Sequence, residues 1–211
     1  MRLIRHVKAS NLLSFGPDGL DLELQDLNVL IGPNGSGKSN FLEVFELLKS
    51  LPRGEEDSNN LRGLISRGGG TNELFWKGGF FPYVSVQVLL TVEDIFLGYP
   101  LGHKFYINRL GFIEKESVRN PANEEHQSNV STIYERNKYD RYSMFNFKTS
   151  KLEETKILPD FTLSILSQRL GNAYLSDLAS TYERIRLYRE WSFGRNTIFR
   201  TPQRADQRND R

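Results

Sequence analysis

Gly32-Pro-Asn-Gly-Ser-Gly-Lys-Ser39 is the stretch that decides the fold of this 211-residue chain. It satisfies the pattern G-x-x-x-x-G-K-[ST], which a chain of this length matches by chance roughly one time in a hundred at average residue usage. An apolar run, 27–31, precedes it, and a helical periodicity begins at Lys38. The alternative is a plain glycine turn between a strand and a helix, but this context favours a phosphate-binding loop.

The residue types of this loop suit a polyphosphate. Glycines at 32, 35 and 37 let successive backbone N–H groups point inward as an anion nest. The helix that follows adds the positive end of its dipole and its unpaired N–H groups. Lys38 can reach the β- and γ-phosphates, and the Ser39 hydroxyl is placed to ligate Mg²⁺. The sequence therefore predicts binding of ATP or ADP with Mg²⁺.

The elements on either side of the loop follow from hydrophobic periodicity. Residues 2–14 predict a strand, residues 15–19 a turn, and residues 20–25 a half-buried strand with alternating leucines. The nearly continuous apolar run 27–31 predicts a central parallel strand that is covered on both faces. Residues 38–50 predict an amphipathic helix, which Pro52 and Gly54 end.

The second half of the chain has a different pattern. Valines and leucines alternate with mostly polar residues from Val84 to Val92, which is typical of an antiparallel strand. Strand-like pieces follow around 103–117 and 130–147, and residues 161–182 predict helix. This order favours an α/β fold with a mixed sheet over a uniform alternation of strands and helices.

The loop and its flanks resemble those of a known group of ATPases. GPNGSGKSN followed by FLEVFELL is similar to the heads of RecF, SMC (structural maintenance of chromosomes) and OLD-type AAA family ATPases, in which Asn40 is characteristic. Asn11-Leu-Leu-Ser-Phe15 and Ile65-Ser-Arg-Gly-Gly69 are similar to segments of the same heads. The resemblance implies the amino-terminal part of an ABC-type head, a P-loop NTPase fold with an antiparallel β-subdomain beside a parallel core.

That resemblance also implies domain bounds and binding residues. The amino-terminal lobe is expected over 1–182, with the β-subdomain at about 80–150, and a basic segment over 183–211 is expected to lead toward a further lobe. The expected cofactor-binding residues are Gly32, Pro33, Asn34, Gly35, Ser36, Gly37, Lys38, Ser39, Asn40 and Arg67.

Two of the implied residues lie outside the loop. Arg67 is expected to face the nucleotide or DNA. Gln168 closes Leu163-Ser-Ile-Leu-Ser-Gln168, and in the related heads a strand ends at a glutamine that touches Mg²⁺ or the attacking water. The alternative for Gln168 is an exposed helix residue. Ser39 and Gln168 are thus the candidate metal ligands.

The residues that hydrolysis needs are missing from the sequence. The best match to an apolar strand ending in acids, Val88-Leu-Leu-Thr-Val-Glu-Asp94, alternates like a two-faced strand and has its acidic pair reversed. No serine-glycine signature motif is present, and His6, His103 and His126 are expected to be surface or packing residues. We therefore expect the catalytic residues to lie in a longer protein, and the signature motif to come from a second head or a partner protein.

Composition excludes several classes of protein. The absence of cysteine rules out disulfides and thiolate zinc sites, and it fits a reducing cytoplasm. The longest apolar runs are far shorter than the ~18 residues that a membrane span needs. No apolar stretch follows the basic residues at the amino terminus, so we expect no signal peptide and a cytoplasmic protein.

Nucleic acid is a candidate partner. Eight arginines follow Tyr182, at positions 184, 186, 189, 195, 200, 204, 208 and 211, and such a basic stretch is either a DNA contact or a solvated end. Residues 134–148 interleave aromatic and basic side chains, which suits single-strand binding. The favoured alternative there is a two-faced hairpin with aromatics inward and charges outward.

Three functions fit these observations. The first is a RecF/SMC-like ATPase that serves DNA repair, maintenance or phage defence. The second is a nucleotide-sensing interaction module that does not hydrolyse ATP, since the water-activating glutamate is missing. The third is a small-molecule P-loop kinase, against which the succession of antiparallel strands after the first helix argues.

Overall fold

We describe a computed structural model of the chain. The structure describes residues 3–91, 100–120, 132–138, 141–146, 149, 151–155, 162–168 and 170–188. Glu93, Asp94, His126 and the arginines from Arg189 onward, all singled out from the sequence, lie outside the described residues.

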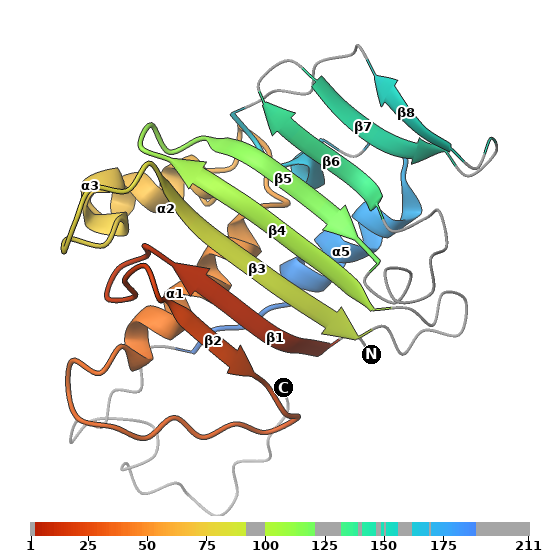
Figure 1. The fold of residues 1–211 in the computed structure, drawn as a ribbon. Coiled ribbons are helices and arrows are strands. Elements are labelled where there is room, and N and C mark those ends of the chain that lie inside the picture. Colours follow the sequence, from red (N-terminus) through yellow and green to blue (C-terminus); the bar gives the residue numbers. More distant parts are fainter. Residues whose placement is uncertain are drawn as a thin grey trace, which may run out of the picture.

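One sheet organises the described part of the chain (Figure 1). Its strand order is β2-β1-β3-β4-β5-β6-β7-β8, and every pair of neighbouring strands is antiparallel. The strands are β1 Leu3–Ser10, β2 Leu20–Glu23, β3 Tyr83–Thr91, β4 Leu101–Asn108, β5 Ile113–Arg119, β6 Thr132–Lys138, β7 Arg141–Asn146 and β8 Lys151–Thr155. The α/β fold class expected from the sequence is confirmed, but the expected mixed sheet with a parallel core is not found: in the described residues all neighbouring strands are antiparallel, because no described strand pairs in parallel beside β1 or β3.

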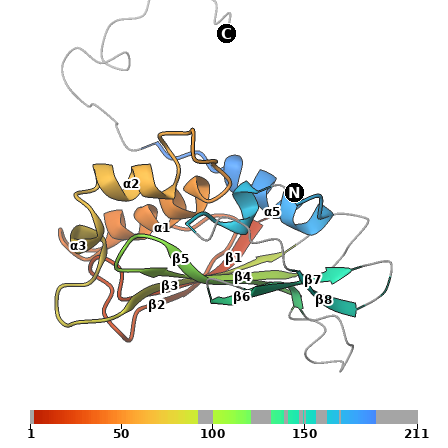
Figure 2. The same cartoon turned by 90° about the horizontal axis from the view of Figure 1, so that it is seen from above.

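The helices cover one face of this sheet, and the opposite face carries no helix of the described chain (Figure 2). They are α1 Lys38–Ser50, α2 Leu61–Arg67, α3 Thr71–Leu74, the 3-10 helix η1 Ile165–Ser167 and α5 Ala173–Glu183. None of the helices in the described ranges is long and apolar enough to cross a bilayer.

Alternation along the strands explains this two-layer arrangement. In β3, the side chains of Val84, Val86 and Val88 are fully buried against the helices, whereas Ser85 and Gln87 face the open side. The helices contribute their apolar stripes to the same core, as α1 does with its residues Phe41, Val44, Leu47 and Leu48. A single hydrophobic layer therefore holds the helices on the sheet.

Further sequence expectations need correction, among them the strand-like piece 130–147, whose described part forms two strands, β6 and β7. The run 27–31 forms no strand: its residues lie in an irregular segment, and Leu27 and Ile31 are 82% and 91% exposed. The strand-like piece 103–117 is two strands, β4 and β5, because Gly111 turns the chain with a φ of 82°. In the described part of 161–182, helix is confined to η1 and α5.

The failure at 27–31 has a physical reason. A short apolar run becomes a strand only where neighbouring strands pair with its backbone and other elements cover its side chains. Within the described residues no strand pairs with 27–31. The last backbone hydrogen bond to the sheet before this run joins Leu24 N to the Arg5 carbonyl, 2.7 Å, and an ion pair joins Arg5 to Asp26 at 2.6 Å.

Candidate nucleotide-binding site

The phosphate-binding loop lies directly before α1, at an open helix end. Gly37 is the N-cap residue, with a φ of 90°, and no side chain caps the helix. The first intrahelical bond runs from Phe41 N to the Gly37 carbonyl, 2.8 Å. The N–H groups of Lys38, Ser39 and Asn40 therefore start the helix without intrahelical partners, which makes this end an anion-binding site.

Two glycines of the loop are required by conformation. Gly35 and Gly37 both have a positive φ, 82° and 90°, which other residues adopt at a cost. At Gly37 space is limiting as well, since a Cβ would lie 3.1 Å from Ser14 Oγ and 3.2 Å from the Phe15 ring. The loop can thus curl tightly against the Asn11–Phe15 segment only with glycine at 37.

Lys38 turns back into its own loop. Its Nζ donates to the carbonyls of Gly32 and Pro33, both at 2.7 Å, and to Ser36 Oγ at 3.2 Å. The ammonium is therefore already held among the backbone groups that a phosphate would meet. A phosphate oxygen can replace these carbonyls as the acceptor, with the gain of a charge-assisted hydrogen bond.

Asn40 joins the loop helix to the amino-terminal segment. Its Nδ2 donates to Ser14 Oγ at 2.8 Å. That segment is itself held by two bonds of Asn11, from its Nδ2 to the Tyr83 carbonyl at 3.1 Å and from Trp76 N to its carbonyl at 2.8 Å. The sequence singled out residues 11–15 and Asn40 separately, and the structure brings them together.

Arg67 contacts elements other than the loop, and Gln168 lies in a segment distant from it in sequence. The Arg67 guanidinium donates to the Ser58 carbonyl and lines a hollow of about 190 Å³ with Glu46 and Lys49, in the carboxy-terminal half of α1. Gln168 follows the 3-10 helix Ile165–Ser167, so no strand ends at this glutamine. The roles given to Arg67 and Gln168 by resemblance stay predictions.

The described residues contain no cluster of three or more His, Asp or Glu side chains that could hold a metal ion. They therefore offer no acidic site that would complete the coordination of Mg²⁺ beside the loop. The loop itself offers the Ser39 hydroxyl, which is exposed. The donors present thus fit a Mg²⁺ that keeps mainly phosphate oxygens and water as ligands.

A buried ionic cluster that was not expected from the sequence lies between the sheet and the helices. Glu116 is fully buried and accepts from Ile165 N at 2.9 Å, while its other carboxylate oxygen lies 3.2 Å from His103 Nε2. His103 Nδ1 lies 2.9 Å from the Tyr182 hydroxyl, and the Arg136 guanidinium lies 3.5 Å from Glu116. These bonds fasten η1 and α5 to strands β4, β5 and β6.

This cluster is a structural one. Burial works to raise the pKa of Glu116, but hydrogen bonding from His103 and the charge of Arg136 outweigh it, so that its pKa is lowered. Burial raises the pKa of the Tyr182 phenol. His103 was expected to be a surface or packing residue, and its burial agrees with a packing role. The charged side chains of 134–148 were expected to point outward, which is wrong for Arg136, since this residue is 2% exposed.

A glycine loop that curls over an open helix end, with a lysine held at its centre, defines a P-loop nucleotide-binding protein. Residues 27–207 match the model of the family described as "AAA domain, putative AbiEii toxin, Type IV TA system". The match spans most of the chain, so the chain belongs to this family. The expected AAA/ABC-type P-loop ATPase domain is thereby confirmed.

Among solved structures, the chain is similar to one from work on the structural biochemistry of ATP-driven dimerization and DNA-stimulated activation of SMC ATPases. The identity is 17%, the TM-score is 0.41, and the alignment covers 55% of this chain and 67% of that chain. A search of curated proteins gave no significant match.

Proposed function

We propose that the chain binds ATP with Mg²⁺ at the P-loop and acts as the nucleotide-binding part of an ATPase head. The observation that carries the proposal is the Lys38 ammonium, held inside a glycine loop at the uncapped start of α1. Bound triphosphate would be held by the loop N–H groups and Lys38, and Ser39 would ligate the Mg²⁺. The bound metal would offset charge on the phosphates.

Hydrolysis in this proposal needs groups from elsewhere. A carboxylate must orient the attacking water, and a second head or a partner protein would supply the signature motif. In the complete assembly we propose a cytoplasmic ATPase that serves DNA repair, maintenance or phage defence. Isolated, the chain should be a monomer or a weak dimer whose mass in gel filtration does not respond to ATP.

Thermal unfolding with and without nucleotide tests the binding. ATP–Mg²⁺ at about 100 times its dissociation constant should stabilise the fold by about 2.7 kcal/mol. Lys38→Ala should abolish this shift, and the matched variant Lys49→Ala, in the last turn of the same helix, should keep it. Equal shifts in the wild type and in Lys38→Ala would refute the proposal.

The second candidate is a nucleotide-sensing module that binds without hydrolysis. The lack of a metal-holding acidic group in the described residues favours it for the isolated chain. A small-molecule kinase is the weakest candidate, because the strands that follow α1 are all antiparallel. Product detection with supplied acceptors would separate the kinase from the other two.

A further inference from the structure

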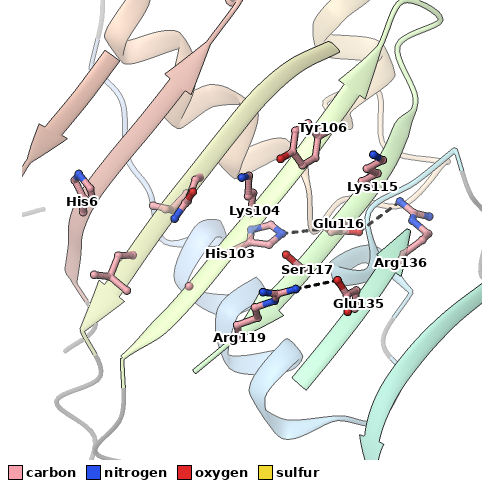
Figure 3. Close-up of a pocket in the computed structure, with 14 residues that line it drawn as sticks. His6, His103, Lys104, Tyr106, Lys115, Glu116, Ser117, Arg119, Glu135 and Arg136 are labelled. Atoms are coloured by element: carbon pink, nitrogen blue, oxygen red, sulfur yellow. Dashed lines mark hydrogen bonds and ion pairs between the residues drawn. The ribbon is translucent and has the colours of Figure 1, made fainter. Parts of the chain in front are cut away.

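The face of the sheet opposite the helices carries a hollow of about 540 Å³ (Figure 3). Its lining comes from β1, β3, β4, β5 and β6. Small-molecule sites are concave and commonly occupy 300–1,000 Å³.

One of the lining residues of the hollow is Gly102, in the second position of β4. It pairs with Leu89 on β3 and with Arg119 on β5. Gly102 does not have a positive φ, and a Cβ added to it would meet only the Arg119 carbonyl, at 3.8 Å. Neither backbone conformation nor packing therefore requires glycine here.

A glycine in the interior of a strand destabilises it by roughly 0.5–1 kcal/mol relative to alanine. Such a residue often marks a place where a ligand approaches the backbone closely. Since the fold of the described chain gives Gly102 no other use, we infer that the missing side chain keeps the hollow open.

The walls of the hollow carry positive charge. The ammonium groups of Lys104 and Lys115 lie 5.2 and 5.9 Å from the centroid of the same ring, that of Tyr106. Within the part of the chain that the structure describes, neither ammonium is paired with a carboxylate. Arg119 adds a third cation and is bonded to Glu135 at 2.9 Å. Lys104 and Lys115 therefore converge on one ring, and Arg119 stands farther along the same hollow, at the level of Gly102.

The acids around this centre limit the size of a ligand. One cross-strand row of paired residues runs across the sheet in the order Asp21, Lys8, Gln87, Lys104, Ser117, Glu135, Ser143, Glu154. Its middle offers cations and hydrogen-bond donors, while both ends are carboxylates. A long polyanion lying across the strands would meet like charge at each end, so the charge pattern favours a compact anion.

We propose that this hollow binds a compact, multiply charged phosphate anion, namely a pyrophosphate group, either free or carried by a nucleotide. Lys104 and Lys115 supply the charge, the hydroxyl of Ser117 donates a hydrogen bond, and the bare backbone at Gly102 admits the ligand. The site is separate from the P-loop, on the other face of the sheet.

Isothermal titration of the Lys38→Ala protein tests the proposal, because this variant removes binding by the P-loop. Pyrophosphate should bind, and Lys104→Gln/Lys115→Gln should weaken the binding at least tenfold. Lys77→Gln, a change of equal charge on an exposed lysine paired with Glu73, should leave it unaltered. Binding that is unchanged in the double variant, or no binding at all, would overturn the proposal.

Gly102→Val is the second variant. Valine suits a strand, and its side chain would project from a lining position of the hollow. We expect it to weaken pyrophosphate binding at least tenfold in a protein whose thermal stability is equal or higher. Unchanged binding would overturn the role of Gly102.

Two further ligands define the anion. ADP that binds at least tenfold more tightly than pyrophosphate would identify a nucleotide as the carrier, and equal affinities would identify the free anion. A single-stranded oligonucleotide that binds more tightly than both, with the same dependence on Lys104 and Lys115, would overturn the compact-anion proposal.

Discussion

The two sides of the P-loop differ in how much of the fold surrounds them. On the helix side, Leu48 of α1 is fully buried, and Asn40 is bonded to the amino-terminal segment. On the other side, the run 27–31 has exposed side chains and no pairing strand in the described residues. The comparison teaches that the helix that follows a phosphate-binding loop can be packed in the core while the segment that precedes the loop is exposed and unpaired.

The largest effect should come from the ionic cluster that fastens the helix layer to the sheet. Glu116→Gln leaves Arg136 and His103 buried beside an uncharged amide, and breaking such a pair costs about 3–5 kcal/mol. Chemical denaturation measures this loss of unfolding free energy. A loss below 1 kcal/mol would show that the helix side does not depend on the cluster.

The same carboxylate predicts a pH dependence. Its pKa is lowered in the folded protein, so its contribution to stability is present above the ordinary glutamate pKa and is lost as the pH falls through the lower, folded value. Acid unfolding of the wild type should therefore be steeper below about pH 4.5 than that of Glu116→Gln. Parallel curves for the two proteins would contradict the assignment.

The next largest effect should come from truncation of a core side chain in the last turn of α1. Leu48→Ala removes a fully buried side chain and should lower the unfolding free energy by about 2–5 kcal/mol. The matched change Leu110→Ala, at a side chain that is 73% exposed, should stay within about 0.5 kcal/mol. Similar losses for the two variants would show that α1 is not packed as described.

A smaller effect is expected at the joint between the loop helix and the amino terminus. Asn40→Ala removes the hydrogen bond to Ser14 Oγ and should cost about 1 kcal/mol of stability. A double-mutant cycle with Ser14→Ala measures the coupling. Full additivity of the two variants would mean that the bond contributes nothing.

The smallest effect is expected on the strand side. Leu27→Ser and Ile31→Ser should each change the unfolding free energy by less than about 0.5 kcal/mol, because both side chains are exposed. Losses of 2 kcal/mol or more would show that 27–31 is covered in the isolated chain, and the contrast between the two sides of the loop would have to be abandoned.

The elements on the helix side of the loop could be predicted from the sequence, whereas the segment on its other side could not. The loop, α1 and the alternation of β3 depend on near neighbours in sequence, so their patterns predicted them correctly. Whether the run 27–31 or the short segment of β8 forms a strand depends on other strands that pair with it. The sequence of β8 has a single apolar residue, Leu152, so its hydrophobic pattern does not predict a strand. Local patterns could not settle either of these.

The buried ionic cluster did leave a signal in the sequence. His103 is in phase with Leu101 and Phe105 in β4, and Arg136 is in phase with Tyr134 in β6. Period-two alternation thus places both charged groups on the buried face, where each needs a partner. The partner Glu116, and the absence of Arg67 from the loop, depend on the register and packing of distant segments.

ATP turnover by the purified chain tests the central claim most directly, namely that the loop is sufficient for binding and insufficient for hydrolysis. Measured beside nucleotide binding under the same conditions, turnover should stay at background while ATP–Mg²⁺ binds through Lys38. Robust turnover that is lost in Lys38→Ala would contradict the account and would show that this chain supplies its own catalytic carboxylate.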